Sequence, residues 1–326
     1  MVLSAYLKHR TPRKSARERR TDERRAEMWT RVLGAEIDPH LLSMSAWEAF
    51  IDARSCGAVD ARGSRVAAGR RRHVGPRTVE ADCQWLRWVF NWATRWRLDS
   101  GDFLMRENPV RGYDVPRERN PRRPTATQDR YEAVRAVSDL VETELRRGRR
   151  VRARSYLSEL LDIVNGTGRR ISAVCALTHA DLRLAEGPHG AIRWPASTDK
   201  AGLESTVSVS PSVRAAIDRV REERPGTGSA PLFPSPGDPH RPMTRHLADK
   251  WLRRAERLAG LEPQRGSLWH AYRRKWATER KHHPDVDVAA AGGWKTVQTL
   301  KTAYQQADEE TMLRVVLDAR ELRDRR

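Results

Sequence analysis

Four X-Pro steps between residues 108 and 127 place the strongest constraint on how this 326-residue chain folds. The prolines of these steps are Pro109, Pro116, Pro121 and Pro124, preceded by Asn, Val, Asn and Arg. A residue before proline is pushed out of the helical region, so closely repeated steps interrupt regular structure. We therefore predict a Pro/Arg-rich linker, residues 116–127, between two lobes. The chain length agrees, because single hydrophobic cores stop growing at about 250–300 residues.

Both lobes carry a large positive charge. Lys and Arg outnumber Asp and Glu by 62 to 43, a net charge of +19. Residues 1–124 contribute +10 and residues 125–326 contribute +9. This even division favours two lobes that face the same polyanion, such as a nucleic acid.

The composition also excludes some classes of protein. No stretch approaches the roughly 18 apolar residues that span a bilayer, and no apolar segment follows the cations near the start of the chain. The cysteines Cys56, Cys83 and Cys175 lie far apart and predict neither a disulfide framework nor a Cys-x-x-Cys zinc site. We expect a cytoplasmic protein that does not bind a membrane.

The first lobe is predicted to be helical. Residues 1–34 form a basic N-terminal extension in this interpretation, with nine cations between residues 8 and 25, and residues 35–115 form a helical domain. Ser43 or Ser45 can cap a helix that carries Trp47 and Phe50. The role of the cation run is open: it either binds accessory DNA or is disordered.

A second helix of this lobe, Thr78–Trp96, carries four indole rings at spacings of three, four and four: Trp85, Trp88, Trp92 and Trp96. A core stripe is the favoured interpretation, because base stacking requires exposed rings and a single-stranded partner. Polar residues at intervals of four occupy the opposite side, and three arginines precede the helix. We take these as the candidate DNA contacts, with a solvated polar face as the alternative for the helix: Arg87, Asn91, Arg95, Arg70, Arg71 and Arg72.

The second lobe is predicted to combine many helices with a small sheet. Helical patterns span Gln128–Arg147, Ser155–Val164, Ser212–Glu223, Arg245–Leu258, Leu268–Arg280 and Thr311–Arg323. Two short strands, Ala191–Pro195 and Ser205–Val209, form a hairpin with Lys200 in its turn.

Arg170 follows a glycine turn that ends one helix, and a new helix begins beneath it. Free backbone N–H groups beside a guanidinium can hold a phosphate. The alternative is an ordinary turn with a solvated arginine. His270 and Arg273 are spaced i, i+3, which places a proton carrier and an oxyanion clamp on one helical face.

Lys200 is conspicuous because the chain has 54 arginines and eight lysines, and none of the other lysines lies between Ser15 and Asp249. Arginine keeps its proton in proteins, whereas lysine, with a pKa of about 10.4, can act as a general acid. Its isolation favours a role in proton transfer, with an exposed turn lysine as the alternative.

A Gly292-Gly293-Trp294 turn precedes a late tyrosine, Tyr304. The pattern of residues 289–302 predicts helix, glycine turn and helix. A helix-turn-helix DNA-binding motif is therefore the alternative interpretation of this stretch. The one tempting metal-like patch is formed by His282, His283, Asp285 and Asp287, and a polar loop is the favoured interpretation.

Taken in order, the Gly-Arg-Arg-Ile-Ser segment, the hairpin lysine, the His-x-x-Arg pair, Gly-Gly-Trp and the late tyrosine resemble the tyrosine recombinase (phage integrase) family. The resemblance covers nearly the whole second lobe, and residues 78–112 look like the end of that family's helical core-binding domain. It implies a mainly α fold of the α+β class. A helical core-binding domain would precede a mostly helical catalytic domain, residues 128–326, with a small antiparallel sheet of the DNA breaking-rejoining enzyme type.

The resemblance also implies roles for six residues. Arg170 and Arg273 would bind the scissile phosphate, Lys200 would protonate the departing 5′ oxygen, and His270 would assist proton transfer. Trp294 would occupy the position of a His or Trp, and Tyr304 would be the nucleophile.

The activity implied by the resemblance is site-specific recombination of double-stranded DNA through a 3′-phosphotyrosyl intermediate. Neither a metal ion nor a cofactor is implied, and the acting form would be a homotetramer on synapsed sites, associated with the nucleoid of a prokaryote or with a phage or mobile element.

Two positions depart from the family pattern. The acidic residue expected three positions after the first arginine is Ala173, and the leucine expected before the second arginine is Tyr272. Two other functions stay open: a relaxing enzyme of the type IB topoisomerase kind, and a non-catalytic DNA-binding protein such as a decayed recombinase or a helix-turn-helix regulator. The loss of an acid at position 173 favours decay, whereas retention of the reactive residues opposes it.

Overall fold

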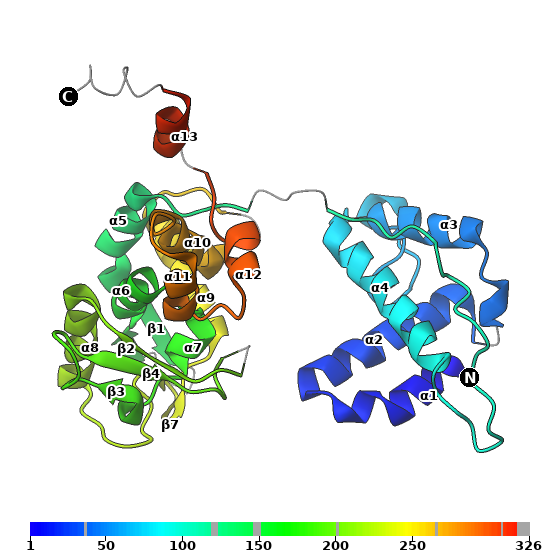
Figure 1. The fold of residues 1–326 in the computed structure, drawn as a ribbon, viewed down its shortest axis with the longest axis horizontal. Helices are drawn as coiled ribbons and strands as arrows, with labels where there is room; N and C mark the ends of the chain where they lie inside the picture. The colour runs from blue at the N-terminus through cyan, green and yellow to red at the C-terminus, as the bar shows by residue number, and fades with distance from the viewer. Residues whose placement is uncertain are drawn as a thin grey trace. The chain divides into compact units, whose positions relative to one another are not determined.

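The computed structural model describes residues 1–35, 38–118, 123–145, 151–199, 202–264, 267–307 and 309–317. The chain divides into two compact units, Met1–Pro121 and Arg122–Arg326. The division falls within the predicted linker. Figure 1 shows the elements of both units, which are treated separately below.

The first unit is helical. Its long elements are α1 (Val2–His9), α2 (Ala16–Leu33), α3 (Met44–Ser55) and α4 (Pro76–Ala93). Short 3-10 turns are η1 (Thr11–Arg13), η2 (Pro39–Leu41) and η3 (Ala68–Arg70). Ser43 caps α3 as predicted, because its hydroxyl accepts a hydrogen bond from the Ala46 N–H at 3.2 Å.

Residues 1–34 are part of the core of this unit rather than an extension set apart from it. Trp29 of α2 is fully buried, lies 4.1 Å from the ring of Phe50 and donates its indole N–H to the carbonyl of Asp82 at 3.1 Å. Asp22 accepts from the indole N–H of Trp85 at 2.8 Å. The cation run hides this role in the sequence, because most arginines of α2 are exposed, whereas Asp22, Ala26, Met28 and Trp29 on the same helix are buried.

The predicted indole stripe is a core stripe for three of its four rings, although α4 ends at Ala93, before Trp96. Trp85 is buried, whereas Trp92 and Trp96 pack against Tyr6 and His9 of α1 with ring centroids 5.2 and 4.8 Å apart. Trp88 differs, because 56% of its surface is exposed.

The second unit contains nine of the described α-helices. They are α5 (Gln128–Ala136), α6 (Leu157–Thr167), α7 (Ile171–Cys175), α8 (Pro211–Glu223), α9 (Arg245–Leu258), α10 (Leu268–Glu279), α11 (Asp285–Gly292), α12 (Val297–Ala303) and α13 (Glu309–Val316). Two 3-10 turns are η4 (Ser138–Leu140) and η5 (His179–Asp181). The predicted class, mainly α with small antiparallel sheets, is confirmed.

The strands pair in three small antiparallel sheets. β1 (Glu142–Leu145) pairs with β2 (Val151–Arg154), and β6 (Pro234–Ser235) pairs with β7 (Asp238–Pro242). The third sheet has the order β3 (Leu182–Arg183), β4 (Ala191–Trp194), β5 (Ser205–Ser208). In the predicted hairpin, Trp194 of β4 lies opposite Ser205 of β5.

Helix α6 runs through the centre of the second unit. Leu157, Leu160, Leu161 and Ile163 on this helix are each fully buried, in one core with residues from α8, α9 and α10. A smaller core joins Trp276 of α10 to α11 and α12. Figure 1 shows α10, α11 and α12 grouped at one end of the unit.

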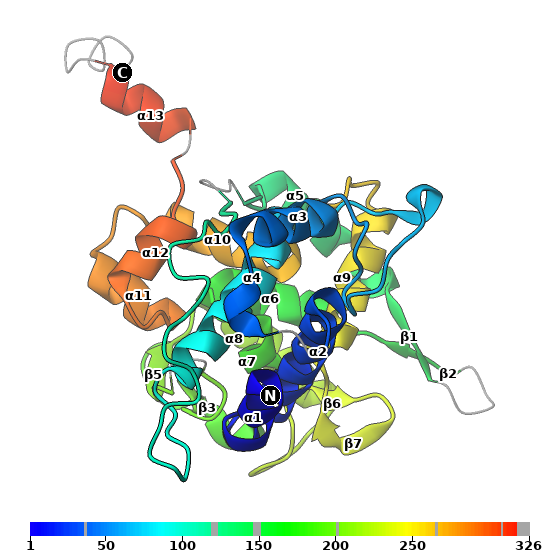
Figure 2. The same ribbon diagram turned by 90° about the vertical axis from the view of Figure 1, so that its right-hand side faces the viewer.

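The predicted helix Gln128–Arg147 is wrong in its second half. Helix α5 ends at Ala136, η4 follows, and the chain then enters β1. The register places Glu142 opposite Arg154 and Glu144 opposite Arg152, so acidic and basic positions face each other across the hairpin. Figure 2 shows this hairpin extending from the side of the unit.

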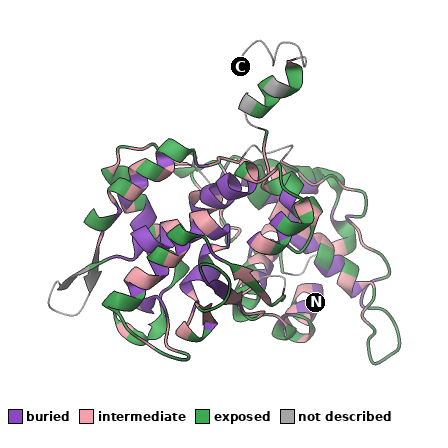
Figure 3. Cartoon of the chain, turned by 60° about the vertical axis from the view of Figure 1, so that its left-hand side comes forward, coloured by how far each residue is buried: buried purple, intermediate pink, exposed green. Residues whose placement is uncertain are grey.

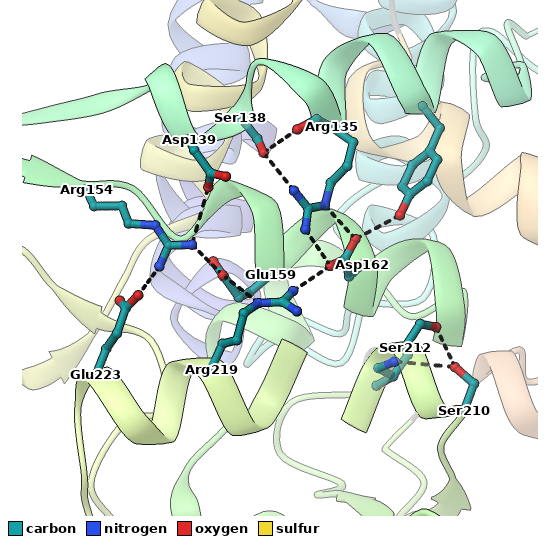
Figure 4. Close-up of polar contacts among 12 residues, drawn as sticks. Arg135, Ser138, Asp139, Arg154, Glu159, Asp162, Ser210, Ser212, Arg219 and Glu223 are labelled. Carbon is teal, nitrogen blue, oxygen red and sulfur yellow. Dashed lines mark hydrogen bonds and ion pairs between the residues drawn. The ribbon is translucent and has the colours of Figure 1, made fainter. Parts of the chain in front are cut away.

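An ion-pair network joins α5, α6, α8 and the end of β2 (Figure 4). Asp162 on α6 accepts from Arg135 at 3.0 Å and from Arg219 at 2.8 Å. The carboxylate of Glu159 is fully buried and accepts from Arg154 at 2.7 Å. Because every link of this network is internal to the unit, we assign it a structural role: removal of one partner would leave a buried charge such as that of Glu159 uncompensated.

Helix α13 lies apart from α5–α12 in both ribbon views (Figures 1 and 2). Its apolar residues Met312, Leu313, Val315 and Val316 are exposed. The described part of this helix is drawn mainly in green, the colour of exposed residues, in Figure 3. The part of the predicted helix beyond residue 317 lies outside the described residues. None of the helices described in either unit is long and apolar enough to cross a membrane.

We expect Trp29→Ala to destabilise the first unit by about 3–5 kcal/mol, because it removes a fully buried indole from the core. Urea unfolding of the full chain, followed by hydrogen exchange in α2–α4, measures this loss. Arg19→Ala on the exposed side of α2 is the matched control. A loss below about 0.5 kcal/mol for Trp29→Ala would restore the interpretation of residues 1–34 as a separate extension.

Candidate active site

Helix α10 carries two of the predicted site residues on one face. Leu268, Trp269 and Tyr272 of this helix pack in the main core, which fixes the helix and leaves the other face toward the glycine turns. His270 is half-buried, whereas Arg273 is 1% exposed.

The Arg273 guanidinium donates hydrogen bonds to backbone carbonyls at the ends of two helices. Its Nη1 donates to the carbonyl of Gly168 and, at 2.7 Å, to that of Gly292, and its Nη2 donates to Gly293 at 3.4 Å. Gly168 and Gly292 lie at the C-termini of α6 and α11, where the helix dipole favours a cation. Burial, followed by the charge of Arg170, lowers the pKa of Arg273 to about 9, so the group stays cationic at neutral pH.

The glycine at position 168 is required by both its conformation and its surroundings. Gly168 has a φ of 63°, and a Cβ on it would lie 2.4 Å from the ring of Trp276. The indole N–H of Trp276 donates to the carbonyl of Gly166 at 3.0 Å. This close packing of α6 on α10 brings the carbonyl of Gly168 within reach of Arg273.

Arg170 begins α7 as predicted and is partly exposed. Its Nη1 donates to the carbonyl of Gly293 at 3.4 Å and lies 3.6 Å from Oδ1 of Asp199. One quarter of its side chain is accessible, compared with 7% of the Asp199 side chain. The guanidinium is therefore held on one side and open on the other.

Its neighbour Arg169 is buried and faces the same turn. Arg169 donates to the carbonyls of Ala291 at 2.9 Å and Ala290 at 3.1 Å, and to the hydroxyl of Ser205 at 2.8 Å. Its Nη1 lies 3.6 Å from Oδ2 of Asp199. Burial lowers the pKa of Arg169 to about 10, and the nearby Asp199 carboxylate counteracts this shift.

Gly293 fits between these groups because it has no side chain. It ends α11 with a φ of 71°, and a Cβ there would lie 2.3 Å from Nη1 of Arg169 and 3.3 Å from Oδ2 of Asp199. The glycine turn of the predicted helix-turn-helix therefore contacts arginines of its own unit.

Trp294 and Tyr304 lie against Arg273. The Arg273 guanidinium lies 3.7 Å from the ring centre of Trp294 and 5.1 Å from that of Tyr304. The two aromatic rings meet edge to face with centroids 4.9 Å apart, and Trp294 stacks on Trp276 at 5.9 Å. Cation–π contact with Arg273 and stacking on Trp276 fix the orientation of Trp294.

The backbone of Tyr304 is held from α10. Thr278 donates its hydroxyl to the Tyr304 carbonyl at 3.3 Å, and Arg274 donates to the carbonyl of Ala303 at 3.4 Å. Arg274 also bonds Pro124 and Ser267. The helix that carries His270 and Arg273 therefore also positions the tyrosine.

His270 lies beside the tyrosine, with ring centroids 6.2 Å apart. Burial and then the charge of Arg273 are the main causes that lower the pKa of His270 to about 4. The imidazole is therefore neutral at pH 7 and can accept a proton.

Two donors in this cluster find no acceptor among the described residues. They are the indole N–H of Trp294 and Nε of Arg273, both buried. Buried donors without partners are uncommon in folded proteins. An anion with several oxygens would supply the missing acceptors.

Lys200 lies outside the described residues. The structure describes its neighbour Asp199, in the turn that follows β4. The other five predicted residues of the site, Arg170, His270, Arg273, Trp294 and Tyr304, are brought together by the contacts above.

In the first unit, two of the predicted DNA contacts line a polar hollow. Arg87 and Asn91 of α4 share it with Thr94, Arg106, Glu107, Asn108 and Arg111. Asn108 donates to the side-chain oxygen of Asn91 at 2.8 Å. Arg95 is exposed outside the hollow, and Arg70, Arg71 and Arg72 are exposed in the segment before α4.

The imidazoles of His282 and His283 contact each other at 4.2 Å. Within the described part of the chain, no three His, Cys, Asp or Glu side chains gather as metal ligands would.

Sequence reasoning missed Arg169, Asp199 and Arg274 as parts of the site, and Arg106 and Arg111 as parts of the hollow. The available signals were adjacency, because Asp199 precedes the predicted lysine and Arg169 and Arg274 flank the predicted arginines. Nothing in the sequence indicates that residues 30 positions apart form an ion pair.

Comparison with known proteins places this geometry in a family. The phage integrase family profile matches residues 133–311. A search of curated protein sequences gave no match.

Solved structures share the fold at low sequence identity. A lambda integrase dimer bound to a COC′ core site is 14% identical with a TM-score of 0.66, over 94% of this chain and 78% of that one. The Tn1549 transposon integrase in complex with circular intermediate DNA is 16% identical with a TM-score of 0.63, over 97% and 98%. XerH site-specific recombinase bound to a palindromic difH substrate is 15% identical with a TM-score of 0.61, over 91% and 77%.

The profile covers more than half of the chain, and it spans every described residue of the arginine and tyrosine cluster. This chain belongs to the phage integrase family, the tyrosine recombinases.

Proposed function

We propose that this protein is a site-specific DNA recombinase in which Tyr304 attacks a DNA phosphate. The observation that carries the proposal is the position of the Tyr304 ring, 5.1 Å from the Arg273 guanidinium and 6.2 Å from the His270 ring. Three separate segments, α10, the glycine turn and the end of α12, converge to make this arrangement.

The cations hold the phosphate. The open side of Arg170 faces the non-bridging oxygens, Arg273 adds positive charge from its buried position, and the buried indole N–H of Trp294 supplies a further donor. In-line attack spreads negative charge over the equatorial oxygens, and preorganised donors stabilise that charge without reorganising. Fixing Arg273 on helix-end carbonyls provides this preorganisation.

In the cleavage step, the hydroxyl oxygen of Tyr304 forms a bond to phosphorus, and the bond from phosphorus to the 5′ oxygen breaks. The tyrosine proton passes to the neutral imidazole of His270. The phosphate charge opposes the cations that depress the pKa of His270, so the imidazole becomes a better base when DNA is bound.

The departing 5′ oxygen takes a proton from Lys200, which leaves a 5′ hydroxyl and a 3′-phosphotyrosyl link. Attack of a 5′ hydroxyl from another strand on this link reverses the step and releases Tyr304. Because each step exchanges one phosphoester for another, rejoining requires no ATP.

The first unit supplies DNA contacts through the polar hollow on α4. Arg87, Arg106 and Arg111 line it, and their charges suit phosphates on either side of the Asn91–Asn108 pair. The exposed arginines at positions 70–72 and 95 extend the basic surface of the same unit.

Recombination of two DNA sites requires four active sites, so a homotetramer on double-stranded DNA is the proposed acting form. The exposed apolar residues of α13 suit contact with another protomer. Such a protein acts on the cytoplasmic DNA of a prokaryote or of a phage or mobile element.

We expect Tyr304→Phe to retain DNA binding and lose covalent attachment, because the nucleophilic oxygen is removed. A nicked duplex that bears the cognate site, run on a denaturing gel, reports the adduct. Tyr131→Phe, on α5, is the matched control and keeps the adduct. An adduct that survives in Tyr304→Phe would show that another residue attacks the phosphate.

We expect Lys200→Arg to keep DNA affinity and slow cleavage by about 100-fold, because the charge is retained and the transferable proton is not. A substrate with a 5′-bridging phosphorothiolate needs no proton on its leaving group, so it restores the rate. Lys250→Arg, exposed on α9, is the control. If the phosphorothiolate gives no recovery, Lys200 is not the general acid.

We expect replacement of both Arg106 and Arg111 by Ala to reduce the slope of log affinity against log salt by about 1.8, as the loss of two phosphate contacts requires. Fluorescence anisotropy with labelled DNA at several salt concentrations measures the slope. Arg19→Ala is the control for loss of exposed charge. An unchanged slope in the double variant would remove the hollow from the DNA interface.

A further inference from the structure

Arg169 and Arg170 share one carboxylate, which comes from the hairpin rather than from their own helix. Asp199 places Oδ1 3.6 Å from Arg170 and Oδ2 3.6 Å from Arg169. The ion pairs that the two arginines form with described residues both go to this side chain. On α7 itself, the position three residues after Arg170 is Ala173, which has no charge to offer.

Asp199 is placed with little freedom to move. Its side chain is 7% exposed, and its backbone N–H donates to the carbonyl of Pro195 at 3.3 Å. The Asp199 carbonyl accepts from the N–H of Gly202 at 3.0 Å. Gly293 lies against the carboxylate, since a Cβ there would come within 3.3 Å of Oδ2.

The two ion pairs differ in what they do. Arg169 is 3% exposed and is already fixed by the carbonyls of Ala290 and Ala291, so Asp199 supplies it with a counter-charge. Arg170 is one quarter exposed and has a single hydrogen bond to a described residue, at 3.4 Å to Gly293. Without Asp199, its long side chain would have several rotamers available.

We propose that Asp199 is a positioning residue that orients Arg170 toward the scissile phosphate. The proposal rests on the function proposed above. One carboxylate oxygen pairs with Arg169, whose side chain is fixed. The other oxygen therefore has a defined position from which it pairs with Arg170. The same contact links Asp199, the residue before Lys200, to Arg170, the arginine proposed to bind the phosphate.

The test is a double-mutant cycle on single-turnover cleavage of a saturating nicked substrate. We expect Asp199→Asn to slow cleavage by about 10- to 100-fold, because a misplaced phosphate clamp weakens transition-state binding. DNA affinity should change by less than about twofold, since most contacts to DNA lie elsewhere. In an Arg170→Ala background, Asp199→Asn should have no further effect, because the group that it orients is gone. In a Lys200→Arg background the full effect should persist.

Loss of a counter-charge beside buried Arg169 also lowers stability, so the cycle is repeated with Arg169→Met. Removing both members of a buried pair avoids a stranded charge. Asp199→Asn should still slow cleavage in the Arg169→Met protein, but by less than in the wild type, because Asp199 has lost the contact that fixes it.

Two results would overturn the proposal. The first is an equal slowing by Asp199→Asn with and without Arg170, which is the behaviour of a purely structural residue. The second is cleavage by Asp199→Asn at or above the wild-type rate, which would make the carboxylate a competitor of the phosphate. Failure of the wild-type protein to form any adduct would instead refute the proposed recombinase function.

Discussion

The site depends on one buried charge. A guanidinium removed from water must place its N–H groups on acceptors inside the protein. Arg273 does so on the carbonyls of Gly168 and Gly292, at the C-termini of α6 and α11, where the helix dipoles also offset its charge. Because Arg170 follows Gly168 by two residues and Trp294 follows Gly292 by two, fixing these helix ends fixes the backbone that carries both side chains. Hydrogen bonds to backbone carbonyls therefore hold the site together, and the side chains proposed to face DNA extend from the segments that they fix.

Charge has two separate uses in this molecule. Most of the arginines that the structure describes are exposed on helices and loops, and their contribution to DNA affinity falls with salt. Arg169 and Arg273 are buried, and each is bound by several carbonyls at defined distances. Arg170 lies between the two groups, held by Asp199 on one side and accessible on the other. The net charge of +19 thus indicates a polyanionic partner, whereas the positions of a few buried cations indicate the reaction.

Much of the fold and most of the site were predictable from the sequence, for local reasons. Helices α8 and α9 have capping residues, Ser210 and Thr244, and regular apolar spacing. Arg170, His270, Arg273, Trp294 and Tyr304 stand in an ordered set of motifs. The packed role of residues 1–34 was not predictable, because cations dominate the helix that carries Trp29. The β1–β2 hairpin was missed although charged residues alternate with others in the first strand, because the helical pattern that begins at Gln128 was extended across it. The ion pairs of Asp199 join segments 30 residues apart, and no local pattern reports such a contact.

The central claim is that the oxygen of Tyr304 becomes bonded to a DNA phosphate. The most direct test is to trap the covalent complex on a nicked duplex, digest it with protease and nuclease, and identify the nucleotide-bearing peptide by mass spectrometry. The account predicts a peptide that contains Tyr304 linked to a 3′ phosphate, with a free 5′ hydroxyl on the other product. Attachment at another residue, linkage to a 5′ phosphate, or hydrolysed DNA without any attached peptide would contradict it.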